Sequence, residues 1–198
     1  MHIKTSVIKE REHSQANLVH YENVFDSKTC IKIIDFSQAN LEMEKALVGI
    51  GNTSSRRKSD IAWIKPSSET NFIFSKIIEK MNYVNKFYNF DLVGITEPIQ
   101  FTSYDGSGNE HYGWHLDMDG GFKSRRKLSI VIQLSDENEY EGGELQIDTC
   151  TVDGQFTVGN QKRGSMIFFP SYMRHRVTPV TSGHRFSLVS WISGQPYK

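Results

Sequence analysis

Hydrophobic residues in the first half of the chain follow the spacing of amphipathic helices. Between residues 67 and 87 they recur about every 3.6 positions, the repeat of one helix face. They are Phe72, Ile73, Ile77, Ile78, Met81, Val84 and Phe87. We interpret this stripe as a core face, with Ser67 or Ser68 as the helix cap. A second helical pattern covers residues 28–46, and residues 60–65 predict a short strand.

From about residue 97 onward the pattern changes to short strands. Runs rich in β-branched and aromatic residues alternate with Gly, Asn and Asp turns. The expected strands cover residues 99–104, 111–116, 128–134, 144–148, 155–158, 165–169, 175–180 and 185–192. Strands of this length and spacing predict a jelly roll or a related barrel. The expected fold class is therefore mainly β with N-terminal helices (α+β).

The composition suits one globular domain and argues against several protein classes. The 198 residues include 23 basic and 23 acidic side chains, so the net charge is zero. A dedicated nucleic-acid binder normally carries a basic surplus. No apolar run reaches the ~20 residues of a membrane span, and the charged start lacks the apolar core of a secretory signal. Cys30 and Cys150 are expected to be free thiols. We therefore expect a cytoplasmic protein with no membrane partner, whose oligomeric state stays open.

One short motif places two possible metal ligands on the same side of a predicted strand. His115 and Asp117 are two positions apart at the end of the strand over residues 111–116, so their side chains project together. His175, at the start of a distant predicted strand, offers a third ligand. Two histidines and one carboxylate on one face of a metal leave other positions open. That arrangement suits non-haem Fe(II).

A second His-x-Glu triplet, His20-Tyr21-Glu22, lies in the polar N-terminal segment. No strand pattern precedes it, and such triplets arise by chance. We interpret it as a surface feature.

A buried cation is predicted close to the metal ligands. Arg185 lies ten residues after His175, at the start of the last predicted strand. An arginine inside a barrel is costly unless it meets an anion. A guanidinium pairs with a carboxylate through two hydrogen bonds. Ser187 on the same strand face, and Tyr104 on the opposite wall, could add donors to that carboxylate. The metal ligands and this carboxylate receptor together indicate a site for a chelating dicarboxylate co-substrate.

These motifs resemble the Fe(II)/2-oxoglutarate-dependent dioxygenases, specifically their prolyl 4-hydroxylase-like branch. The resemblance runs in unbroken order from residue 99 to residue 192, about half of the chain. Its motifs occupy residues 104–108, 112–117, 126–135, 140–145, 164–170, 175–187 and 191. Several ordered motifs at fitting separations are far more specific than the His-x-Asp triplet alone.

The resemblance implies a double-stranded β-helix (jelly-roll) core over residues 96–198. Residues 1–95 would form an N-terminal helical support region packed on the outer sheet, in one structural domain overall. It implies His115, Asp117 and His175 as iron ligands, and Arg185, with Ser187, as the receptor for the distal carboxylate of 2-oxoglutarate. The tyrosine that commonly contacts this carboxylate would be Tyr104 or, alternatively, Tyr112. Gln133 is either a co-substrate contact or a packing residue.

The resemblance also implies an oxidoreductase that hydroxylates an unactivated C–H bond. Its cofactors would be Fe(II), the co-substrate 2-oxoglutarate and O₂, with ascorbate as a candidate reductant. A peptide or protein proline is the first choice of substrate; a nucleic acid, a free amino acid or another small metabolite are the alternatives. A different class, a non-catalytic 2-oxoglutarate or metal sensor, predicts the loss of a ligand or of the arginine. The sequence retains all four residues.

Other polar and aromatic residues are expected to have structural or peripheral roles. His184 is expected on the opposite strand face from Arg185, Asp119 in a turn, and Trp114 and Trp191 in the cavity wall. The basic runs at residues 56–58 and 123–127 are interpreted as solvated faces that could rim the active site. Arg57, Ser59, Asp60, Trp63 and His111 could touch a substrate.

Overall fold

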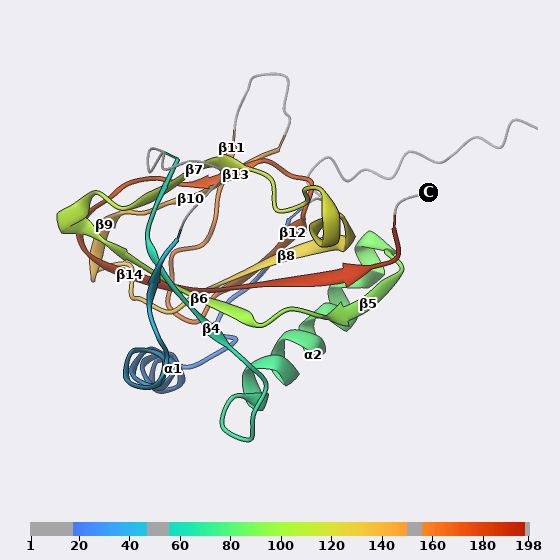
Figure 1. The fold of residues 1–198 in the computed structure, drawn as a ribbon, viewed down its shortest axis with the longest axis horizontal. Coiled ribbons are helices and arrows are strands. Elements are labelled where there is room, and N and C mark those ends of the chain that lie inside the picture. The colour runs from blue at the N-terminus through green and yellow to red at the C-terminus, as the bar shows by residue number, and fades with distance from the viewer. Residues whose placement is uncertain (1–17, 47–55, 150–155, 197–198) are drawn as a thin grey trace, which may run out of the picture.

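Two antiparallel sheets face each other, and two helices cover the outer side of the larger one (Figure 1). The computed structural model describes residues 18–46, 56–149 and 156–196. In the larger sheet the strands run in the order β1-β12-β8-β14-β6-β4-β2, and β5 and β9 also pair with β14. The smaller sheet has the order β11-β10-β13-β7-β3. This is the predicted mainly β, jelly-roll architecture.

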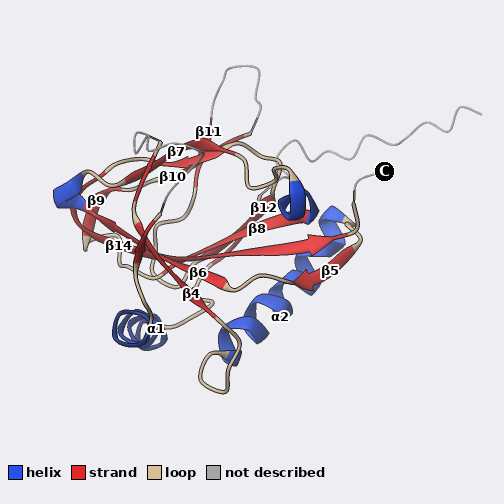
Figure 2. Ribbon diagram, viewed as in Figure 1, coloured by secondary structure: helices blue, strands red, loops and turns tan. Residues whose placement is uncertain are grey.

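The strands of the larger sheet are β1 (Val19–Tyr21), β2 (Glu44–Lys45), β4 (Asp60–Ile64), β5 (Leu92–Ile95), β6 (Ile99–Asp105), β8 (Arg126–Gln133), β9 (Tyr140–Gly142), β12 (Met166–Pro170) and β14 (Val180–Gly194). Those of the smaller sheet are β3 (Arg57–Lys58), β7 (His111–His115), β10 (Leu145–Asp148), β11 (Phe156–Val158) and β13 (His175–Val177). The helices are α1 (Ser27–Asn40) and α2 (Asn71–Tyr88), and the short 3₁₀ segments are η1 (Gly106–Gly108) and η2 (Gly121–Arg125). Figure 2 shows both helices on the same side of the larger sheet.

The central strands of the larger sheet are buried on both faces and divide their side chains between two cores. In β8, Ile130 and Ile132 join the core beneath the helices, whereas Val131 joins the core between the sheets. In β14, Leu188 packs on the helix side and Arg185 faces the space between the sheets. Because successive strand residues point to opposite faces, one strand supplies both a structural face and a functional face.

Helix α2 packs through a face slightly rotated from the predicted stripe. Ile73, Ile77 and Val84 are buried as expected, and Phe74 joins them. Three predicted members instead face outward: Phe72, Ile78 and Phe87 are 37%, 41% and 69% exposed. The stripe in the sequence is wider than the single helix face that the sheet can cover.

Both predicted helices have the wrong boundaries. The first ends at Asn40 rather than at residue 46, because Leu41 turns extended and residues 44–45 pair with β4 as β2. The second begins at Asn71 and not near residue 67. There the hydroxyls of Ser67 and Thr70 hydrogen bond each other (3.0 Å) and form a separate turn before the helix.

The predicted strands from residue 99 onward are present, with shifted ends. The strand expected over residues 175–180 is shorter, because β13 stops at Val177 and the chain enters β14 at Val180. Strands β1, β2, β3, β5 and β9 were not predicted; four of these, β1, β2, β3 and β5, lie in the first 95 residues, so this region is not only helical. No helix in the described part of the chain is both long and apolar enough to cross a membrane.

Candidate active site

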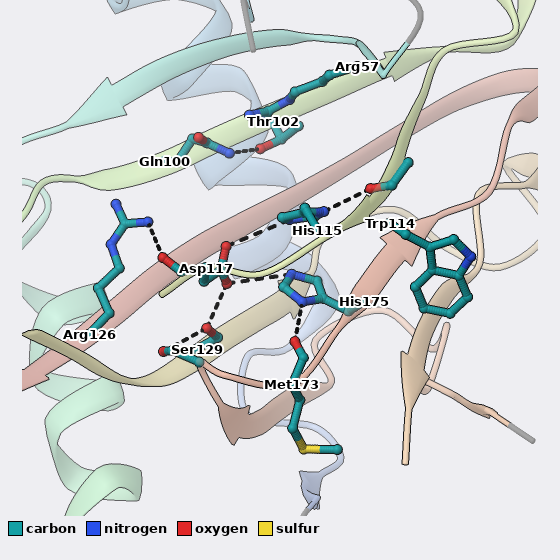
Figure 3. Close-up of polar contacts among 12 residues, drawn as sticks. Arg57, Gln100, Thr102, Trp114, His115, Asp117, Arg126, Ser129, Met173 and His175 are labelled. Carbon is teal, nitrogen blue, oxygen red and sulfur yellow. Dashed lines mark hydrogen bonds and ion pairs between the residues drawn. The ribbon is translucent and has the colours of Figure 1, made fainter. Parts of the chain in front are cut away.

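Three buried side chains with metal-ligand chemistry meet between the two sheets (Figure 3). His115 ends β7, His175 begins β13, and these two residues lie opposite each other in the strand pairing. Asp117 follows β7 after one residue. Its carboxylate oxygens lie 3.7 Å from Nε2 of His115 and 3.5 Å from Nε2 of His175. The structure thus brings together the three residues that the sequence predicted as a triad.

Hydrogen bonds to backbone carbonyls orient both histidines. Nδ1 of His115 lies 2.9 Å from the carbonyl oxygen of Gly113, and Nδ1 of His175 lies 3.0 Å from that of Met173. Because a carbonyl can only accept, we assign the proton to Nδ1, which leaves the Nε2 lone pair for a metal. Burial, with His175 nearby, lowers the pKa of His115 to about 3, so this imidazole is neutral near pH 7.

A hydroxyl group on strand β8 holds the Asp117 carboxylate in place. Ser129 Oγ donates to Asp117 Oδ2 at 2.6 Å, and Ser129 and Ser171 hydroxyls lie 3.0 Å apart. Burial works against the charge of Asp117, but the facing imidazoles and Ser129 keep its pKa below the ordinary value. Two imidazoles and one carboxylate match the donor set of non-haem Fe(II) sites.

The triad faces a cavity of about 290 Å³, and Arg185 lies in its wall. Arg185 is 3% exposed, and its Nε has no hydrogen-bond partner in the described structure. Its Nη1 lies 3.5 Å from Ser187 Oγ, and its guanidinium lies 5.6 Å from the centre of the Tyr104 ring. Among the described residues, no acidic side chain forms an ion pair with Arg185. A buried guanidinium without a counter-ion fits the distal carboxylate of 2-oxoglutarate.

The other predicted co-substrate contacts occupy different positions. Tyr104 and Tyr112 both line the cavity, and the Tyr112 ring stacks on His115 with 3.5 Å between ring centres. Gln133 does not line this cavity; together with Arg185 it lines a small neighbouring one. Its amide donates to the Ser135 carbonyl at 3.2 Å and to the Tyr140 hydroxyl at 3.1 Å. Gln133 therefore has the contacts of a packing and orienting residue.

A buried ion pair near Asp117 was missed from the sequence. Arg126 is 5% exposed, forms an ion pair with Glu97, and donates to the Asp117 carbonyl at 3.3 Å. Its guanidinium lies 3.7 Å from the centre of a Trp191 ring. Treating residues 123–127 as a solvated run was therefore wrong for Arg126 and Lys127, which are both buried. The missed signal is that this run continues directly into the strand at residue 128.

The three tryptophans differ in their relation to the cavity. Trp63 and Trp191 line it, and their rings lie 6.4 Å apart. Trp114, expected in the wall, is not among the cavity-lining residues and instead contacts Arg174 and Arg176, whose guanidiniums are 4.8 and 4.7 Å from its ring centre. The strand places Trp114 on the opposite face from His115.

Several residues expected to be peripheral are indeed away from the cavity. His184 is exposed and lies 3.6 Å from Asp105. Asp119 accepts a hydrogen bond from the Gly120 amide within its turn. His20 is exposed, as expected, although it belongs to β1, a strand that was not predicted. His111, by contrast, was predicted as a residue that could touch a substrate, but it is not among the cavity-lining residues; its Nδ1 lies 3.0 Å from the Asn109 carbonyl oxygen.

Comparison with known proteins places this geometry in a family. The model of the 2OG-Fe(II) oxygenase superfamily matches residues 99–193. A PKHD-type hydroxylase from Prochlorococcus marinus (strain SARG) is 32% identical over 170 residues, which cover 84% of this chain and 72% of the relative. A PKHD-type hydroxylase from Synechococcus sp. (strain CC9605) is 44% identical over 87 residues, which cover 43% of this chain and 38% of the relative. Matches to this and two further relatives span only 38–44% of the relatives' lengths.

Solved structures share the fold at low sequence identity. A Pseudomonas putida prolyl-4-hydroxylase superposes with a TM-score of 0.71 at 18% identity, covering 92% of this chain and 95% of that one. A Trichoplax adhaerens prolyl hydroxylase, in complex with a hypoxia inducible factor peptide fragment, gives a TM-score of 0.71 at 15% identity, with coverage of 92% and 86%. The family match spans the strands that carry the triad, and the Prochlorococcus relative is similar over most of both chains. The chain therefore belongs to the 2OG-Fe(II) oxygenase superfamily.

Proposed function

We propose that this protein is an Fe(II)- and 2-oxoglutarate-dependent dioxygenase that hydroxylates an unactivated C–H bond. The observation that carries the proposal is the buried, unpaired Arg185 in the wall of the cavity that the His-Asp-His triad faces. A metal site alone would fit many functions. The metal site with a carboxylate receptor beside it fits a chelating dicarboxylate co-substrate.

In this proposal His115, Asp117 and His175 hold Fe(II), and Arg185 anchors the distal carboxylate of 2-oxoglutarate with help from Ser187. Bound Fe(II), 2-oxoglutarate and O₂ supply the oxidising chemistry, and ascorbate is a candidate reductant. The protein's own contribution is to orient the metal ligands and to keep water out of the site. Ser129 fixes the rotamer of Asp117, and Tyr104 is 3% exposed in the cavity wall.

A peptide or protein proline is the substrate that we propose first. Support comes from the PKHD-type hydroxylases and from the prolyl hydroxylases of the same fold. The cavity also has aromatic walls, Tyr112, Trp63 and Trp191, which suit an apolar five-membered ring. A free amino acid, another small metabolite or a nucleic acid remain the alternatives, since a shared fold does not fix a substrate.

Uncoupled turnover tests the reaction class without knowledge of the substrate. We expect succinate to form from 2-oxoglutarate in the presence of Fe(II) and O₂, and to be abolished in His115→Ala and Asp117→Ala. His184→Ala is the matched control, because this exposed histidine lies outside the cavity. A wild-type protein that binds 2-oxoglutarate and metal but forms no succinate would be a sensor instead. A mass increase of one oxygen atom in a proline peptide would then identify the substrate.

We further propose a cytoplasmic location. Support comes from Cys30, a buried free thiol in α1, which is typical of a reducing compartment. Cys150 lies outside the described residues. Cell fractionation with an antibody to the protein tests this location.

A further inference from the structure

The basic run at residues 56–58 contains one side chain that differs from its neighbours. Arg56 donates to the Trp114 carbonyl at 2.9 Å, and Lys58 donates to the Gly108 carbonyl at 2.7 Å. Both side chains are exposed, and their hydrogen bonds go to backbone carbonyls of neighbouring segments. Arg57, between them in β3, lines the cavity that the triad faces. Only the middle member of the run therefore reaches the candidate active site.

Arg57 is held in place by neutral groups. Its Nε donates to Ser59 Oγ at 2.9 Å, and Ser59 is 1% exposed. Its guanidinium lies 4.4 Å from the centre of the Tyr112 ring. No ion pair within 4 Å joins Arg57 to an acidic side chain in the described part of the chain. The guanidinium is thus positioned but not neutralised.

The guanidiniums that line the cavity differ in their counter-ions. Arg126 is paired with Glu97. Arg185 and Arg57 have no acidic partner among the described residues, and both lie close enough to Tyr104 to oppose the rise in its pKa that burial causes. In the proposed function 2-oxoglutarate supplies one free carboxylate, which Arg185 takes. Arg57 and Lys123 are the remaining cavity-lining cations without an acidic partner among the described residues. Of the two, Arg57 is the one held in place, by Ser59 and the Tyr112 ring, and it is therefore the cation available to the second ligand of the cavity, the substrate.

The position of Arg57 limits where the substrate's anion can be. The Tyr112 ring lies 4.4 Å from the Arg57 guanidinium and 3.5 Å from the ring of His115, a proposed metal ligand. Only one aromatic ring therefore separates the cation from the metal ligand. Since consecutive Cα atoms of a peptide are about 3.8 Å apart, a group bound to Arg57 belongs to the reacting residue or to a residue close to it in the peptide.

We propose that Arg57 is a specificity-determining residue that binds a carboxylate of the substrate. The carboxylate is either an Asp or Glu side chain beside the hydroxylated residue of a peptide, or the α-carboxylate of a small amino-acid substrate. The inference rests on the proposed function. It goes further by stating the charge that the substrate carries and the residue that reads it.

Paired ligands and paired variants test the inference. Fluorescent proline peptides carrying Asp or its isostere Asn on either side of the proline are titrated into enzyme loaded with Mn(II) and 2-oxoglutarate. Free proline and prolinamide compete with them in a second arm. Wild type should bind at least one carboxylate ligand about tenfold or more tightly than its amide. Arg57→Gln should reduce this ratio to about one, and Arg57→Lys should retain part of it.

Arg56→Gln and Lys58→Gln are the matched controls, because they remove an equal charge from the same basic run and neither residue lines the cavity. Both should keep the carboxylate preference, and Arg57→Gln should keep its affinity for 2-oxoglutarate. A preference for Asp over Asn in the peptides would identify a side-chain carboxylate as the group that Arg57 binds. A preference for proline over prolinamide would identify the α-carboxylate of a free amino acid. Equal binding of acid and amide in both arms overturns the inference, as does a preference that survives Arg57→Gln. If wild type forms no succinate from 2-oxoglutarate, the proposed function fails instead.

Discussion

Replacing Arg185 with alanine should abolish tight binding of 2-oxoglutarate and leave the metal site intact. The side chain is 3% exposed, so a carboxylate that meets it is withdrawn from water. Removing one partner of such a buried pair costs about 3–5 kcal/mol. Since about 1.4 kcal/mol is a factor of ten, Arg185→Ala should weaken binding by between a hundredfold and several thousandfold. Arg185→Lys should fall between, because an ammonium keeps the charge and loses the planar fork.

Two further variants calibrate this magnitude. Ser187→Ala should cost about 1 kcal/mol, the worth of one hydroxyl hydrogen bond. Gly143→Ala should also weaken binding, since a Cβ there would lie 2.8 Å from Cδ of Arg185 and would have to push it aside. Gly143 also has φ +60°, which adds backbone strain to any replacement.

The assay is an anaerobic titration of 2-oxoglutarate into the Fe(II) enzyme, followed by the absorption band of the metal chelate. Metal affinity is measured separately and should be nearly equal in all variants. If Arg185→Ala binds 2-oxoglutarate as well as wild type, another cation holds the distal carboxylate. Arg57, the other unpaired guanidinium of the cavity, would be the first to examine, and the same titration of Arg57→Gln would identify it.

Three other predictions concern the metal ligand, the thiol and the N-terminal region. Ser129→Ala should weaken metal binding about tenfold or more, as measured by competition with a chelator, because Asp117 loses its 2.6 Å hydrogen bond. Burial raises the pKa of Cys30 from 9.0 to about 11, so the native thiol should resist alkylation at pH 8. The stability that the protonated thiol contributes should be lost as the pH rises from about 9 through 11. Thermal unfolding of the wild type, compared with Cys30→Ala over this pH range, measures that loss. Removing residues 1–95 should give an insoluble product, because the helix-side core would be bare; a soluble, folded fragment from residue 96 onward would contradict this.

Much of the β-rich half was predictable because its strands carry strong local signals. β6, β8, β12 and β14 are rich in β-branched and aromatic residues and are separated by glycine turns. The strands that were missed are short and gain their backbone hydrogen bonds from a neighbour. β2 and β3, for example, have two residues each and pair with β4 and β7. No composition signal distinguishes such a segment from a loop.

The candidate site was predictable where its residues lie on strands of known direction, and less so where partners meet across the fold. His115 and Asp117 follow from the two-residue repeat, and Arg185 from the cost of a buried charge. Glu97 and Arg126 are far apart in sequence, and only the packing of the larger sheet brings them together. From the sequence, Arg57 was predicted both as a member of a basic run and as a residue that could touch a substrate. Its orientation into the cavity depends on the pairing of β3 with β7.

The register of β14 links the helical layer to the chemistry of the cavity. Its odd positions, Arg185, Ser187 and Trp191, face the cavity, while Leu188 and Ile192 pack beneath the helices. A slip of one residue would exchange the two faces, placing leucine in the cavity and a guanidinium against an apolar core. The apolar face that the helices cover therefore excludes the slipped register. In this way packing on the outer side of the sheet fixes the direction in which Arg185 points on the inner side.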